Sequence, residues 1–475
     1  MKTSTVSPGR AGLLLLMTGL MLPQIDTSIT NVALDSITAS LHASATQLEL
    51  IVAMYGVAFA VCLAMGSKLG DNYGRRRLFM WGVAVFSLAS LLCGVSNSIT
   101  ALLAARTLQG AGAALIVPQI LATLHVTMKG TAHARAISLY GGIGGISFIV
   151  GQMFGGWLVS ADIAGMGWRN AFFINVPIGL LVLAFSRRYV PETRRDGHAS
   201  IDWQGTISLG LILCCLLFPM ALGPELHWPW SMRLMLLATI PLLLWMRASA
   251  LHKERRGEHP LLPPRLLKLA SIRFGMVIAL LFFSAWSGFM FCMALTMQSG
   301  LGMAPWQSGN SFVALGVAYF LSAMYAPKLI ARHSMGRIMV AGLAVQISGL
   351  LLLMETFHHF GQSTTTLKLI PSTALIGYGQ ALIVNCFYRV GMRDITANDA
   401  GAGSALLSTV QQATLGLGPA VFGSLLLVLM RNHHGSYTDA MVGFLGVEAV
   451  MMLLLAIIAI GLRHHLNRSP SLATS

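Results

Sequence analysis

The chain has 475 residues, of which 55% are hydrophobic and only 10% are charged. Soluble domains carry about 25% charged residues, so this composition excludes a string of soluble domains and places the chain in a lipid bilayer. A net charge of +15 would suit a nucleic-acid ligand, but the positions of the basic residues decide that question.

Continuous apolar runs recur along the chain, and about 20 such residues let a helix cross the hydrocarbon core. A lipid-embedded β-barrel would instead show alternating segments of roughly ten residues. The runs lie near residues 11–33, 47–67, 78–95, 100–125, 136–160, 168–186, 201–223, 232–248, 271–295, 308–330, 338–356, 367–389, 401–430 and 441–463. The sequence therefore predicts an all-α membrane protein with 14 transmembrane helices.

The first run resembles the core of a secretory signal peptide, but it continues through Asp26 without a small-residue cleavage pattern. We expect it to be retained as the first helix. All six cysteines lie inside apolar runs and none forms a C-x-x-C pair, so disulfides and thiolate metal sites are not expected. The paired histidines at run ends point to different helix faces, which disfavours a metal site.

The basic residues are distributed asymmetrically between the two ends of the runs. Of the 31 Lys and Arg residues, 26 lie in the tails and in the loops after even-numbered runs, four lie in the alternate loops, and Arg106 lies inside a run. Cytoplasmic loops carry the excess of Lys and Arg. The sequence therefore predicts an integral protein of the cytoplasmic or inner membrane, with both termini in the cytoplasm and no nucleic-acid partner.

A weak internal repeat indicates two related halves. The loops after runs two and ten both begin with Lys-Leu, 260 residues apart, and glycines recur in runs five and thirteen. Runs seven and eight have no counterpart and are expected to form an inserted hairpin. The expected units are an N-terminal half at 1–190, a hairpin at 191–250, an interfacial cytoplasmic linker at 251–273, a C-terminal half at 274–463 and a cytoplasmic tail at 464–475.

Four stretches carry motifs, in chain order. In helix one, residues 25–35 are similar to L-D-x-T-I-V-N-V-A-L-P, with Ile25 and Asp35 in place of the first leucine and the proline. The loop after the second run matches G-x-L-A-D-R-x-G-R-K at Leu69, Asp71, Gly74, Arg75 and Arg76, and helix four matches R-x-x-Q-G-x-G at Arg106, Gln109, Gly110 and Gly112. The segment from Trp168 to Gly179 matches W-R-x-x-F-x-I-N-V-P-x-G. Together these resemble the major facilitator superfamily, in particular its drug:proton antiporter subfamily with 14 spanning helices, the EmrB/QacA type.

The chain departs from that subfamily at several positions. Helix five usually carries G-P-x-x-G-G, and here Gln152 replaces the proline, which weakens the expectation of a kinked, leak-tight helix. Leu50 stands where the subfamily often has tryptophan, five residues before the matching Tyr55. Ser67 and Asn72 depart from the loop motif.

The resemblance implies a proton-coupled exporter of small amphiphilic drugs or toxic organic compounds, working by alternating access between the two halves. The expected substrates are small molecules, the expected surroundings are the lipid bilayer, and the protein is expected to function as a monomer. No cofactor is expected, since the proton gradient drives transport. An exporter of one metabolite or siderophore-like compound would carry the same motifs. A membrane-embedded enzyme would need a nucleophile, base or metal set, which the sequence does not present, so neither an enzyme nor a metal site is expected.

Three charged residues are predicted to lie deep within apolar runs, where an ionised group costs about 2.5–3.5 kcal/mol: Asp26, Arg106 and Glu448. Asp26 and Arg106 are both about 10 Å below the outer surface at 1.5 Å per helical residue, so they can form an ion pair. Burial disfavours the ionised carboxyl and the arginine favours it, which suits proton coupling; the alternative is a permanent structural pair. Glu448 is expected to be lipid-facing or locally paired. One central carboxylate favours monovalent cations or neutral molecules as substrates.

The remaining candidate residues have structural alternatives. Uncharged polar residues in the runs are expected either to line the substrate cavity or to bond neighbouring helices. The cluster Asp71, Gly74, Arg75 and Arg76 is expected to form a cytoplasmic latch or a topology anchor, and Gly151, Gly155 and Gly156 to allow close helix packing. The cavity candidates are Gln24, Tyr55, Gln119, Gln152, Gln380, Asn385, Gln411 and Gln412.

Overall fold

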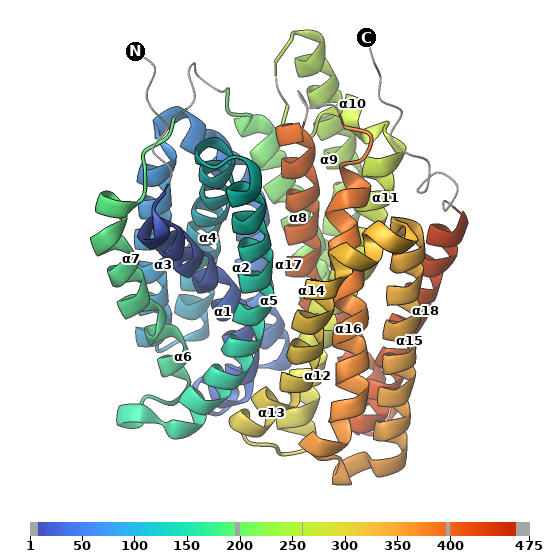
Figure 1. Cartoon of the computed structure of the whole chain (residues 1–475). Helices are drawn as coiled ribbons and strands as arrows, with labels where there is room; N and C mark the ends of the chain where they lie inside the picture. The colour runs from blue at the N-terminus through green and yellow to red at the C-terminus, as the bar shows by residue number, and fades with distance from the viewer. Residues whose placement is uncertain (1–7, 195–199, 259, 396–399, 462–475) are drawn as a thin grey trace.

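The computed structural model describes residues 8–194, 200–258, 260–395 and 400–461, and it confirms the all-α membrane architecture (Figure 1). Thirteen described segments are long and apolar enough to cross a bilayer. Helix α5 (Gly130–Ala161) is 32 residues long and packs along α1, which adds a fourteenth crossing. Helices suit this setting because they satisfy their backbone hydrogen bonds internally, where no water is available.

The first helices form an N-terminal group, drawn in blue to green on one side of Figure 1. Its strongest contacts join α3 with α4, α2 with α4, and α1 with α5. Besides α5, the group comprises α1 (Arg10–Leu41), α2 (Ala45–Tyr73), α3 (Arg75–Val95), α4 (Ile99–Thr127), the short α6 (Asn170–Phe173) and α7 (Asn175–Tyr189).

A C-terminal group, drawn in yellow to red, lies on the other side. Helices α11 and α12 are continuous through a π-helical turn at Ala279–Phe283, so they form one crossing. The group comprises α11 (Ala270–Ile278), α12 (Ser284–Leu295), α13 (Pro305–Ser311), α14 (Val313–His333), α15 (Met335–Phe360), α16 (Thr366–Gly391), α17 (Ala400–Asn432) and α18 (Tyr437–Gly461).

The predicted inserted hairpin consists of α8 (Trp203–Leu222) and α9 (Trp230–Arg255), and the short α10 (Pro264–Leu267) follows it. Helix α8 packs on both α2 and α17, whereas α9 packs mainly on α8 and remains largely exposed. Asp202 holds the base of the hairpin, since it accepts hydrogen bonds from Lys253 Nζ (2.5 Å) and from the backbone N–H groups of Gly205 (2.7 Å) and Leu261 (2.8 Å). Burial raises the pKa of Asp202, but these hydrogen bonds outweigh it and leave the pKa below its usual value.

Several helices extend beyond their apolar runs. The first run ends near residue 33, but α1 continues to Leu41 and ends at His42, which has a left-handed φ of 52°. Ser44 then starts α2 with a capping box: its hydroxyl accepts from the Gln47 N–H, and the Gln47 side chain accepts from the Ser44 N–H. The hydrophobic pattern marks the part of a helix within the hydrocarbon, whereas the caps set its ends.

We call the end of the bundle where α1 begins the proximal end, and the end where α1 finishes the distal end. Hydrogen bonds join the two groups at the distal end. Among them, Ser299 donates to Asp35 (3.1 Å), the Trp306 N–H to Ser160 (3.2 Å), and Gln298 to the Asn31 carbonyl (3.4 Å). Midway along the bundle, α2 and α17 touch backbone to backbone, where a Cβ on Gly416 would lie 2.6 Å from the carbonyl carbon of Gly56. The distal end is therefore closed by direct contact between the groups.

Candidate functional site

An ion pair lies in the middle of the N-terminal group, as the sequence predicts. Asp26 of α1 pairs with Arg106 of α4, and both side chains are fully buried. The second Asp26 oxygen accepts from Gln109 Nε2 (2.6 Å) and from Asn175 Nδ2 (3.1 Å). Three helices, α1, α4 and α7, thus converge on one carboxylate.

The guanidinium of Arg106 is fully buried among polar and aromatic groups of neighbouring helices. Its Nη1 also donates to Gln109 Oε1 (2.6 Å), its Nε donates to the Ile51 carbonyl of α2 (3.1 Å), and it lies 4.4 Å from the ring centroid of Tyr55. Such charge-assisted bonds are strong in a low-dielectric interior. A proton on Asp26 would remove the negative charge that holds Arg106, so the occupancy of one proton site can change how α1, α2, α4 and α7 are held together.

The sequence analysis gave no role to Gln109, Asn175 or Ser90, although Gln109 and Asn175 lie in motifs that it identified. Gln109 is the hub, because its amide oxygen accepts from Arg106 while its nitrogen donates to Asp26 and to Ser90 Oγ (2.8 Å). Arg106 and Gln109 are three residues apart and therefore lie on one face of α4, which was the sequence signal for a shared role.

The predicted cavity residues do not gather in one site. Tyr55 belongs to the Asp26 cluster and donates to the Pro23 carbonyl (3.2 Å), and Gln411 accepts from the Tyr388 hydroxyl (2.6 Å). Gln119 instead donates to the Gly66 carbonyl (2.8 Å) between α4 and α2, and Asn385 bonds within its own helix. Gln152 and Gln380 are fully buried with no described hydrogen-bond partner, and Gln24 and Gln412 are half-buried.

The glycines of α5 lie at close helix crossings, as the packing prediction requires. A Cβ on Gly151 would overlap Ser28 of α1, and one on Gly155 would overlap Ile29. Gly156 faces the other group, where a Cβ would lie 2.5 Å from the Pro305 carbonyl oxygen. One helix face thus follows α1 while the neighbouring face contacts α13.

The predicted latch residues contact the segment after α7. Arg75 pairs with Asp71 (2.7 Å), and its N–H donates to the Thr193 carbonyl (2.9 Å). Glu192 accepts from the Arg76 N–H (3.0 Å). Gly74 has a φ of 105°, and a Cβ added to it would lie 2.7 Å from the carboxylate of Glu192. The described contacts tie the α2–α3 turn to the end of α7, so a latch role stays a prediction.

Two further buried carboxyls lie outside the Asp26 cluster. Glu448 of α18 is fully buried, so the lipid-facing alternative is wrong. Gln346 of α15 is the nearby polar side chain, but neither Glu448 oxygen has a hydrogen-bond partner among the described residues. Glu49 of α2 is 1% exposed, and the sequence analysis did not include it among the buried charges because it lies near the start of its apolar run.

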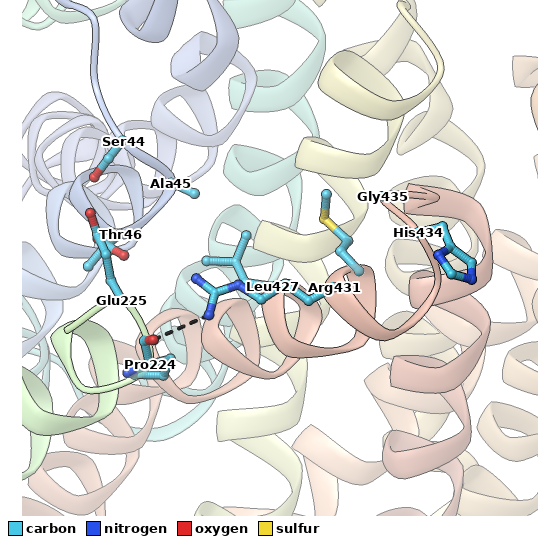
Figure 2. A pocket seen from close by; sticks show the side chains of 10 residues that line it. Ser44, Ala45, Thr46, Pro224, Glu225, Leu427, Arg431, His434 and Gly435 are labelled. Atoms are coloured by element: carbon cyan, nitrogen blue, oxygen red, sulfur yellow. Dashed lines mark hydrogen bonds between the residues drawn. The ribbon is translucent and has the colours of Figure 1, made fainter. Parts of the chain in front are cut away.

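A cavity of about 500 Å³ lies at the distal end, where α2, α17 and the loop after α8 meet. Figure 2 shows Ser44, Ala45 and Thr46 on one side of it and Leu427 on the other. Its polar lining is completed by Glu225, Arg431 and His434, with Arg431 Nη1 donating to the Pro224 carbonyl (3.4 Å).

The sequence matches the family model described as Major Facilitator Superfamily over residues 16–419. It is 32% identical over 416 residues to the probable actinorhodin transporter of Streptomyces coelicolor, covering 87% of this chain and 72% of that one. It is 30% identical over 475 residues to a cephamycin export protein of Amycolatopsis lactamdurans (96% and 93%), and 30% identical over 425 residues to the tetracenomycin C resistance and export protein of Streptomyces glaucescens (89% and 76%).

Solved structures support the same fold. A peptide transporter POT in complex with sulfate superposes with a TM-score of 0.71 at 13% identity, covering 98% of both chains. A proton-dependent oligopeptide transporter gives a TM-score of 0.65 at 14% identity, covering 96% of this chain and 100% of that one. The family match agrees with the two helix groups and with the motifs of helices one and four. The chain is an integral membrane protein that belongs to the major facilitator superfamily, a family of transporters and not of enzymes.

Proposed function

We propose that this protein is a proton-coupled exporter of small amphiphilic drugs or toxic organic compounds. The observation that carries the proposal is the fully buried Asp26–Arg106 pair, a titratable group that links four helices of one group. Relatives of similar length are named as antibiotic export and resistance proteins, which supports the direction of transport and the class of substrate.

The proposed mechanism is alternating access between the two helix groups, with residues 1–190 and 274–463 moving as units around the hairpin. The 26-to-4 distribution of basic residues supports a cytoplasmic position for the proximal end and for both termini. In that orientation the distal hydrogen bonds of Asp35, Ser160 and Asn31 close the outer side. Fourteen crossings favour the 14-helix antiporter subfamily.

Asp26 is proposed to exchange one proton per cycle. In the described state its carboxylate holds Arg106, and protonation would release that arginine and loosen α1 from α4. Exchange of one proton for a monovalent cation is electroneutral, whereas a divalent cation would move net charge at about 2.3 kcal/mol per 100 mV. Monovalent lipophilic cations and neutral amphiphiles are the proposed substrates.

The test is transport by purified protein in acid-loaded vesicles, with proton release followed while candidate compounds are added outside. Compound-dependent proton release and uphill accumulation of the compound are expected. Accumulation that is unaffected when the proton gradient is collapsed would contradict the coupling. Because several relatives are named for a single antibiotic, an exporter of one metabolite is the second candidate, and a response to one compound among many amphiphiles would favour it.

A further inference from the structure

The three parts of the molecule meet at one buried polar cluster near the distal end. Glu49 of α2 faces α17, where Ser424 Oγ lies 3.1 Å from Glu49 Oε2 and 2.7 Å from the Met220 carbonyl oxygen of α8. A Cβ on Gly423 would lie 2.6 Å from Glu49 Oε1, so the glycine leaves room for the carboxyl. The N-terminal group, the C-terminal group and the hairpin thus share one hydrogen-bonded contact.

The number of hydrogens at this contact is limited. The Met220 carbonyl would ordinarily accept from the N–H four residues ahead, but residue 224 is a proline and has none. The Ser424 hydroxyl has a single hydrogen, and the shorter contact directs it to Met220. A neutral Glu49 satisfies both contacts, because its carboxyl hydrogen can be donated to Ser424. An ionised Glu49 would take the serine hydrogen and leave the Met220 carbonyl without a donor. The other Glu49 oxygen, Oε1, has no hydrogen-bond partner among the described residues.

The surroundings offer no compensating cation for an ionised Glu49. None of the ion pairs in the described part of the chain includes Glu49. On α4, Arg106 reaches the Ile51 carbonyl but is held by Asp26 and Gln109. The titratable or charged groups nearest to the site include Glu225 of the loop after α8, Cys292 of α12, and Arg431 and His434 at the distal cavity. Glu448 of α18 also lies near Cys292, close enough to act on the same thiol.

We propose that Glu49 is a second proton-binding site, which carries a proton while the distal end is closed and loses it when that end opens. A buried carboxylate without a compensating cation is strongly disfavoured, so the closed contact selects the neutral acid. Separation of α2 from α17 would expose the carboxyl to water, where the ionised form is favoured.

The distal cavity gives this proton its route. Ser44, Ala45 and Thr46 line the cavity from the first turn of α2, one turn before Glu49 (Figure 2). The proton is therefore taken from the distal side and returned to it, so it adds no current to the exchange at Asp26. The inference rests on the alternating access of the proposed function and adds a proton-dependent control of the distal gate.

The experiment measures the distance across the distal gate between spin labels at Ala45→Cys and Asn432→Cys, in protein whose six native cysteines are replaced by alanine and which still exports. We expect the closed-to-open ratio to fall by up to about tenfold per pH unit as Glu49 loses its proton. Glu49→Gln should keep the gate closed at every pH, and Glu49→Asp should restore a pH response. Glu225→Gln is the matched control, because it removes a nearby acid outside the contact with Ser424, and its gate should still respond to pH.

An unchanged pH response in Glu49→Gln, or no pH response in the native sequence, would overturn the proposal. Hydrogen exchange of segments 44–56 and 420–432 in the unlabelled protein measures the same opening if the labelled variants do not fold. Asp26→Asn with Arg106→Gln separates the two proposals: it should lose proton-driven export but keep the pH response of the gate. Loss of that response in this double variant would place the control at Asp26 and overturn the role of Glu49.

Discussion

Neutralising one member of the Asp26–Arg106 pair should separate its structural role from its coupling role. In Asp26→Asn the guanidinium keeps the Ile51 carbonyl, Gln109 and the Tyr55 ring but loses its counter-charge. Breaking a buried pair typically costs 3–5 kcal/mol. An asparagine can still accept a hydrogen bond here, so we expect a loss of about 3 kcal/mol, seen as a lower melting temperature of the purified protein.

The double variant Asp26→Asn with Arg106→Gln removes both charges. A buried ion pair can often be replaced by neutral groups at little cost, so we expect most of the lost stability to return. Neither variant should accumulate substrate against its gradient in vesicles, because neither has a proton site at this position. Asp26→Glu should keep part of the export. A double variant that regains both stability and uphill export would show that the pair is only a structural element, and Glu448 would become the next residue to test.

Three further predictions follow from other parts of the molecule. Reporter fusions should place both termini in the cytoplasm, and labelling of loop 187–200 from outside would contradict that orientation. Asp71→Asn, or a bulky residue at Gly74, whose Cβ would lie 2.7 Å from Glu192, should slow transport with little change in substrate affinity; a pure loss of affinity would argue against a latch. In cells expressing the protein, a monoquaternary compound should be exported better than its matched bis-quaternary analogue, and equal or greater protection against the divalent member would refute the one-carboxylate argument.

The fold was largely predictable, because the length and spacing of apolar runs follow directly from the thickness of the bilayer. The Asp26–Arg106 pair was predictable for a related reason, since two opposite charges at one depth in a low-dielectric medium have few other partners. Asn175 was harder to place, because its approach to Asp26 depends on how α7 packs against α1, and one-dimensional spacing does not contain that geometry.

Glu49 illustrates a different limit. Its position near the start of a run resembles that of an exposed residue at the membrane surface, and only the packing of α17 and α8 over it makes it buried. The positions of the predicted cavity glutamines were hard to predict for the same reason. Whether Gln119 faces a cavity or the Gly66 carbonyl depends on the rotation of α4 against α2, which hydropathy does not fix.

The contact between Gly56 and Gly416 gives the two groups a pivot. Ala45 at the distal end of α2 lies eleven residues from Gly56, about 16 Å along the helix, whereas Tyr73 at the proximal end lies seventeen residues away, about 25 Å. Any tilt of α2 against α17 about this point displaces each end in proportion to its arm. The proximal mouth would therefore open about one and a half times as wide as the distal one, so a bulky solute would enter from the cytoplasm more easily than it could return from outside.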